Sequence, residues 1–222
     1  MSPARSDRLA VALEGTARKV FASALDWPGW SRSAKTDELA IEALLAYAPR
    51  YAPVAKAARF DFAASFDVDV VERQEGGSGT EFGVPSRVTD ADSRPVNADD
   101  AKRLAAIVEA AWATFDSVAA GAPAELRKGP RGGGRDRDKM IGHVIESDWY
   151  YAREIGIRVE QPSPGDRLAV GALRAAMVDV LRRPSDGRPL ADRRWPARYA
   201  ARRIAWHSLD HAWEMEDRAT PA

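Results

Sequence analysis

Three histidines are the residues of this chain whose type and spacing best suit metal binding. The 222-residue sequence contains only these three, His143, His207 and His211, and each falls in a segment with helical periodicity. Residues four apart lie on one helix face, one turn from each other. His207 and His211 can therefore direct two imidazoles at one ion, and His143 on a neighbouring helix can supply a third. Three histidines leave a coordination position open, as in catalytic zinc sites.

A structural role is the alternative for these histidines. A histidine on the face of an amphipathic helix is usually packed or hydrogen-bonded, and the four-residue spacing does not by itself bring His143 to the pair. Two features favour the metal interpretation. No histidine occurs elsewhere in the chain, and each of the three lies beside apolar helix positions. We therefore expect a divalent-metal site at His143, His207 and His211.

The chain contains no cysteine, which excludes disulfides, thiolate ligands and a cysteine nucleophile. A bound metal would have only nitrogen and oxygen ligands, so the cysteine-rich structural zinc sites are excluded as well. Zinc, nickel, manganese, iron and cobalt remain as candidates. Any thiol chemistry requires a thiol that arrives with a substrate or cofactor.

Two acidic residues lie close to the histidine pair in sequence. Asp210 precedes His211, and Glu214 follows it by three residues. Either carboxylate could orient an imidazole or act as a base, so both are candidate catalytic accessories. The alternative for Glu214 is an ordinary helix ion pair with Arg218, four residues further on.

A basic, glycine-rich segment over residues 127–139 leads into the predicted helix of His143. Arginines beside a helix N-terminus suit an anionic group, so Arg131 and Arg135 are candidates to bind a substrate carboxylate or phosphate near the metal. The alternative is a solvated loop, because neither the P-loop pattern nor the dinucleotide-binding glycine pattern is present.

Four segments in the second half of the chain have the periodicity of amphipathic helices. The first begins after the N-cap Asn97 and continues to about Val118; the others span about Asp138–Ile155, Asp166–Arg183 and Pro196–Arg218. Helices of similar length predict an antiparallel four-helix bundle, in which inward-facing side chains of different helices can hold a metal. His143 lies on the second helix and the histidine pair on the fourth.

The first part of the chain has a different pattern. Residues 17–24 and 66–73 are predicted strands, and between them Thr36 opens a helix that Pro49 and Pro53 break or redirect. The stretch from residue 76 to Asn97 is rich in Gly, Pro, Ser and Asp, as in irregular connectors. We expect an α+β protein with a small α/β domain over residues 1–95 and a four-helix bundle over residues 96–222.

Two segments resemble a known family. They are His143-Val144-Ile145-Glu146-Ser147-Asp148-Trp149-Tyr150-Tyr151 and Trp206-His207-Ser208-Leu209-Asp210-His211-Ala212-Trp213-Glu214-Met215-Glu216-Asp217-Arg218. Over roughly residues 98–218 the chain resembles the DinB-like superfamily of metal-binding four-helix bundles. The resemblance implies a divalent ion, commonly zinc or nickel, on His143, His207 and His211, and a homodimer. Characterised relatives include transferases that use low-molecular-weight thiols such as mycothiol or bacillithiol, and many members have no assigned reaction.

The N-terminal unit is similar, over a shorter motif, to HicB-like antitoxin folds. A predicted strand is followed by Asp26-Trp27-Pro28-Gly29-Trp30 and then by a helix containing Glu38 to Leu44, as in the strand, D-x-P-G turn and helix of that fold. Pro-Gly is also an ordinary turn, so no antitoxin role follows from the motif.

Charge and composition limit the function classes. Lys plus Arg and Asp plus Glu both number 33, so no net charge favours nucleic acid or a membrane surface. We see neither an apolar run of membrane-spanning length nor a signal peptide, and we expect a cytoplasmic protein. The favoured function is a metal-dependent thiol S-transferase or isomerase acting on a small electrophile. The alternative is a non-catalytic bundle, stabilised by metal, with a regulatory or protein-interaction role.

Overall fold

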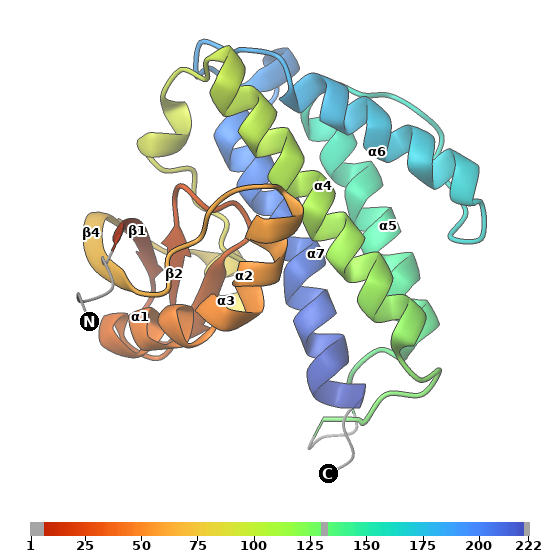
Figure 1. Cartoon of the computed structure of the whole chain (residues 1–222), viewed down its shortest axis with the longest axis horizontal. Coiled ribbons are helices and arrows are strands. Elements are labelled where there is room, and N and C mark those ends of the chain that lie inside the picture. Colours follow the sequence, from red (N-terminus) through yellow and green to blue (C-terminus); the bar gives the residue numbers. More distant parts are fainter. Residues whose placement is uncertain (1–6, 130–132, 220–222) are drawn as a thin grey trace.

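The computed structural model describes residues 7–129 and 133–219 and has the expected α+β fold (Figure 1). Its single sheet has the strand order β3-β2-β1-β4. The strands are β1 Asp7–Gly15, β2 Val20–Ala24, β3 Ser31–Ala34 and β4 Phe66–Glu75. β2 is antiparallel to both β1 and β3, whereas β4 runs parallel to β1.

The two faces of the sheet have different neighbours. Val11 pairs with Ala24, and their side chains join a buried cluster with Leu44 of helix α1 (Asp37–Ala46). Alternation along a strand places Phe21 on the opposite face. There its ring meets Trp206 of the last helix edge-on, with centroids 6.1 Å apart. The sheet therefore packs directly against the helix that carries two of the three histidines.

The N-terminal unit contains more elements than expected. The strand predicted at residues 17–24 begins only at Val20, because Thr16 Oγ1 accepts hydrogen bonds from the backbone N–H groups of Arg18 and Lys19 in a turn. Strands β1 and β3 were not predicted. The D-x-P-G turn therefore leads into β3 and only then into α1, which differs from the strand, turn and helix order of the HicB-like motif.

The prolines after α1 redirect the chain, as expected, and a second helix follows. Thr36 caps α1 by accepting from Leu39 N, and α1 ends at Ala46. Helix α2, Ala48–Ala57, was not predicted. Pro49 is tolerated in the first turn of α2, where a backbone N–H would have no acceptor within the helix. Pro53 lies within the helix.

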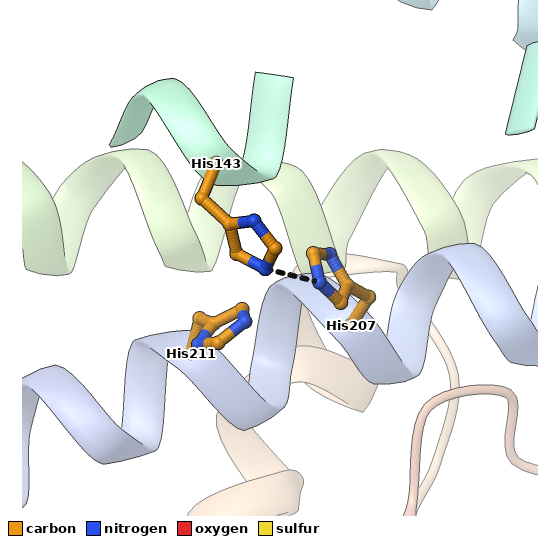
Figure 2. Close-up of side chains that lie close together, drawn as sticks. All are labelled: His143, His207 and His211. Atoms are coloured by element: carbon orange, nitrogen blue, oxygen red, sulfur yellow. Dashed lines mark hydrogen bonds between the residues drawn. The ribbon is translucent and has the colours of Figure 1, made fainter. Parts of the chain in front are cut away.

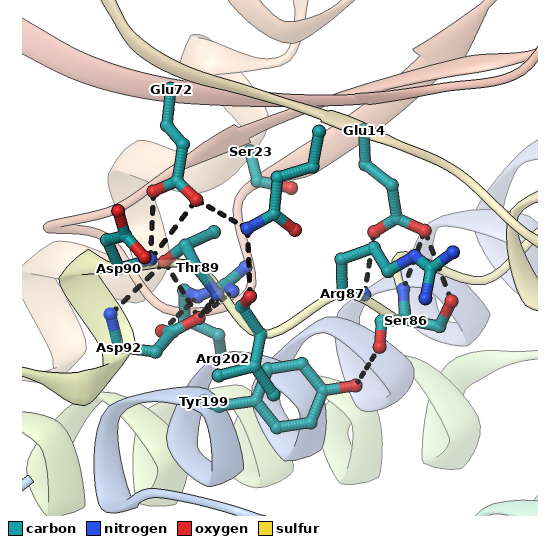
Figure 3. Close-up of polar contacts among 12 residues, drawn as sticks. Glu14, Ser23, Glu72, Ser86, Arg87, Thr89, Asp90, Asp92, Tyr199 and Arg202 are labelled. Atoms are coloured by element: carbon teal, nitrogen blue, oxygen red, sulfur yellow. Dashed lines mark hydrogen bonds and ion pairs between the residues drawn. The ribbon is translucent and has the colours of Figure 1, made fainter.

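The connector over residues 76–97 ties the sheet to the last helix (Figure 3). It contains a short helix, α3 Ser78–Phe82, and a single 3-10 turn, η1 Ala91–Ser93. On the sheet side, the buried Glu14 carboxylate accepts from the backbone N–H groups of Ser86 and Arg87. On the helix side, Arg202 donates to both carboxylate oxygens of Asp92, at 2.8 and 2.5 Å, and Tyr199 Oη donates to Ser86 O.

Four long helices form the bundle: α4 Ala98–Gly121, α5 Arg137–Glu154, α6 Arg167–Leu181 and α7 Ala197–Ala219. A second 3-10 turn, η2 Leu190–Asp192, precedes α7. α4 packs against α7 and α6, and α5 packs against the same two helices. The second and fourth helices of the bundle are therefore direct neighbours, and this adjacency brings His143 to the histidine pair.

The four bundle helices do not simply alternate in direction from one helix to the next along the chain. α5 runs opposite to α4 and α7, but α5 and α6 run in the same direction (Figure 1). The 18 residues of α5 span about 27 Å. The connection over residues 155–166 can extend to about 40 Å and therefore returns the chain to the starting end of α5.

One hydrophobic cluster contains residues of the sheet, of α1 and α2, and of all four bundle helices. The proposed boundary near residue 95 stays a prediction.

Among the described residues, α4 alone has the length and composition of a membrane-crossing helix, and half of its most apolar stretch is buried. It also carries Glu109 and Asp116, so it is not an uninterrupted apolar run.

Candidate metal centre

His143, His207 and His211 converge between α5 and α7 (Figure 2). Nε2 of His143 lies 3.2 Å from Nε2 of His207, and one ligand nitrogen from each of the three residues lies within 4.8 Å of the others. His143 points from α5 toward α7, where the other two rings stand one turn apart with centroids separated by 4.6 Å. The four-residue spacing thus places two imidazoles on one face, as expected.

The donor set fits a divalent ion. Zinc–nitrogen bonds are about 2.0–2.1 Å long, so two nitrogens of a tetrahedral site are about 3.3 Å apart. The 3.2 Å separation between His143 and His207 is close to that value. All three donors are nitrogens, which zinc, nickel and cobalt accept.

Glu214 fixes the orientation of the third ring. Nδ1 of His211 donates to Oε2 of Glu214 at 2.9 Å, and Nη1 of Arg218 donates to Oε1 of the same carboxylate at 2.8 Å. A hydrogen on Nδ1 leaves the lone pair of His211 on Nε2, which is the tautomer required of a ligand. Glu214 therefore both orients the imidazole of His211 and forms a helix ion pair with Arg218.

Burial keeps two of the imidazoles neutral. It lowers the pKa of His143 to about 4 together with the charges of the nearby His211 and Arg135. It also lowers the pKa of His207 well below the usual value, with smaller contributions from His211 and Arg203. Neutral imidazoles have a lone pair free, so these two rings are in the state that binds metal at neutral pH.

Aromatic rings surround the buried part of the cluster. The ring of Tyr151, from α5, meets His207 edge-on with centroids 5.6 Å apart, and the indole of Trp206 lies 6.2 Å from the same imidazole. His207 is 6% exposed, whereas His143 is only half-buried. The cluster is therefore packed on the α7 side and accessible at His143.

The other candidate residues lie at different distances from the cluster. Asp210, next to His211 in sequence, accepts a hydrogen bond from Nη1 of Arg32 at 2.9 Å and so connects α7 to β3. Burial raises the pKa of Asp210, while the charge of Arg32 lowers it. Arg135 is exposed, yet its charge acts on both His143 and His207. Arg131 lies outside the described residues.

Sequence reasoning missed two residues beside the cluster. Neither Tyr151 nor Arg203 was among the candidate site residues. Tyr151 follows His143 by eight residues, and Arg203 precedes His207 by four. Extending the four-residue spacing by two steps from His143 and by one step from His207 is the signal that would have identified them.

Comparisons with family models, with curated proteins and with solved structures found no match to this chain. The DinB-like and HicB-like resemblances therefore rest on the sequence motifs alone.

Proposed function

We propose that this protein binds a divalent metal ion through His143, His207 and His211 and is a DinB-like, metal-dependent thiol S-transferase or isomerase acting on a small electrophile. One observation carries the metal part of the proposal, namely the convergence of three imidazole nitrogens from two helices. Zinc and nickel are the ions that the family resemblance favours.

A bound divalent ion would supply Lewis acidity, which lowers the pKa of a thiol or water and polarises an electrophile. The protein's own residues would provide the rest. Glu214 holds His211 in the ligating tautomer, and Tyr151 and Trp206 pack around His207. The half-buried His143 leaves the cluster open to a small molecule. A low-molecular-weight thiol would serve as the second substrate because the chain has no cysteine.

The first test is elemental analysis of protein purified without a histidine tag. We expect close to one equivalent of metal in the wild type and its loss in His207→Ala and in His211→Ala. Because the chain has no histidine outside the cluster, metal on the wild-type protein could not come from an imidazole elsewhere. Wild-type protein that stays metal-free after incubation with zinc, nickel and manganese would contradict the proposal.

The second test concerns the reaction. Metal-loaded protein is mixed with 2-mercaptoethanol and 1-chloro-2,4-dinitrobenzene, and formation of the thioether with release of chloride is followed by absorbance. We expect a rate above the uncatalysed one that is lost in His207→Ala. A protein that retains metal in the first test but neither binds nor transfers any thiol would instead support the non-catalytic, metal-stabilised alternative.

A further inference from the structure

Arg203 lies beside the histidine cluster and, among the described residues, forms no ion pair. Its Nη1 is buried and, within the described part of the chain, has no hydrogen-bond partner. Its guanidinium carbon lies over the ring of Tyr151 at 5.1 Å and over the ring of Trp206 at 4.7 Å. A buried donor without an acceptor costs free energy, so its retention needs an explanation.

The other arginines of α7 differ in having a carboxylate partner, although Nε of Arg198 and Nη2 of Arg218 are also buried without an acceptor in the described part of the chain. Within the described residues, Arg198 pairs with Asp100, Arg202 with Asp92 and Arg218 with Glu214. Arg203 has two aromatic rings in place of a carboxylate. The rings fix the guanidinium while its N–H groups, which lie in the guanidinium plane, remain free to donate.

Tyr151 connects Arg203 to the candidate metal centre. Its ring contacts both the guanidinium of Arg203 and the imidazole of His207. Arg203 and His207 are four residues apart, so they project from the same face of α7. Arg203 is only partly buried as a whole, so solvent reaches part of its side chain even though Nη1 itself is buried.

We infer that Arg203 is the anchor for a carboxylate group of the molecule that binds at the histidine cluster. A carboxylate is planar and accepts two parallel N–H bonds from a guanidinium, which suits a cation that has aromatic neighbours and, within the described residues, no carboxylate partner. The inference rests on the proposed function and deepens it: the thiol or the electrophile would carry a carboxylate a few bonds from its reacting atom.

The test compares acidic with neutral thiols on the cobalt-loaded protein. Mercaptoacetate, 3-mercaptopropionate, 4-mercaptobutyrate and 2-mercaptoethanol are each titrated, and thiolate coordination is followed by near-ultraviolet absorption. At least one acid should bind about tenfold more tightly than 2-mercaptoethanol, the size expected for a charge-assisted hydrogen bond. That advantage should disappear in Arg203→Gln and persist in Arg183→Gln, a control at an exposed arginine of the α6 C-terminus.

A second variant and a second probe separate the possible failures. Arg203→Lys keeps the charge but not the planar fork of the guanidinium, so it should retain only part of the affinity advantage of the acidic thiols. This variant takes the place of Arg203→Gln if Arg203→Gln does not fold. Propionate is titrated into metal-free protein, and the ¹⁵N–¹H signal of Arg203 Nε should shift saturably. Absence of cobalt binding would contradict the proposed function, while the propionate titration would still decide the role of Arg203. Equal affinity for acidic and neutral thiols, or an acid advantage that survives Arg203→Gln, would overturn the inference.

Discussion

The carboxylate of Glu214 holds the imidazole of His211 from the side away from Nε2, the candidate ligand nitrogen, with Oε2 2.9 Å from Nδ1. Residues that orient a metal ligand in this way typically contribute 10- to 100-fold to metal affinity. We therefore expect Glu214→Ala to weaken zinc binding by about that factor while leaving all three ligands in place. The measurement is a competition titration against a chromophoric chelator.

Glu146 offers a matched control for this prediction. It follows His143 by three residues, as Glu214 follows His211, but it is exposed and, in the described part of the chain, makes no hydrogen bond or ion pair. Glu146→Ala should therefore leave zinc affinity unchanged. Equal losses in the two variants would mean that the overall negative charge near the site, and not the contact with His211, determines affinity.

Gly29 lets the turn after β2 pack against α7. Its φ is +93°, and a Cβ atom there would lie 2.8 Å from Cδ1 of Leu209 and 3.0 Å from backbone and side-chain atoms of Ala205. Positive φ disfavours alanine, and the contacts with α7 are too close for a methyl group. We expect Gly29→Ala to lower the free energy of unfolding by more than about 1 kcal/mol, measured by urea denaturation.

Gly171 provides the opposite case with the same substitution. It lies inside α6, and nothing comes within 4 Å of an added Cβ atom. Alanine is the better helix former, so Gly171→Ala should raise the free energy of unfolding by about 0.5–1 kcal/mol. Unchanged stability in Gly29→Ala would show that the steric account of Gly29 is wrong.

The helices of the bundle were largely predictable because their boundaries are local. Asn97 accepts from the backbone N–H groups of Asp99 and Asp100, and Asp166 accepts from that of Ala169. Both caps are short-range interactions that the sequence displays directly. The predicted helix ends lie within a few residues of those in the structure.

The sheet was less predictable because its strands depend on distant partners. β1 is buried on both faces over its second half, so it lacks the polar alternation that identifies a half-exposed strand. β3 is four residues long and consists of Ser, Arg, Ser and Ala. Only pairing with β2 makes it a strand, and pairing is not visible in a single sequence.

The candidate site was only partly predictable, because it too depends on contacts between distant parts of the chain. The spacing of His207 and His211 fixes their common face, but the position of His143 depends on which helices are neighbours. The bundle places α5 directly against α7, although α6 lies between them in the chain. The proposed role of Arg203 depends on the rings of Tyr151 and Trp206 and on the absence of an ion pair to Arg203 within the described residues.

The ion pair between Arg202 and Asp92 should contribute strongly to stability. The two side chains are 9% and 2% exposed, and removal of one partner leaves a buried charge uncompensated. Such losses are about 3–5 kcal/mol, so Arg202→Met should lower the free energy of unfolding by roughly that amount. Arg182→Met is the control, because Arg182 and its partner Glu109 are nearly half exposed, and it should cost about 0–1 kcal/mol.

The contribution of Asp92 should depend on pH. Burial alone would raise its pKa, but the charge and hydrogen bonds of Arg202, with hydrogen bonds from Thr89, outweigh burial and lower it. The unfolded chain, with an Asp pKa of about 3.9, then binds the proton more tightly than the folded chain, so stability rises with pH. The stabilisation is fully present above the unfolded pKa and is lost as pH falls through the folded pKa. Urea denaturation of wild type and Asp92→Asn should give a difference that is constant from pH 7 to about 5 and shrinks below about pH 4. A difference that stays unchanged down to pH 3 would mean that Asp92 is not held ionised by Arg202.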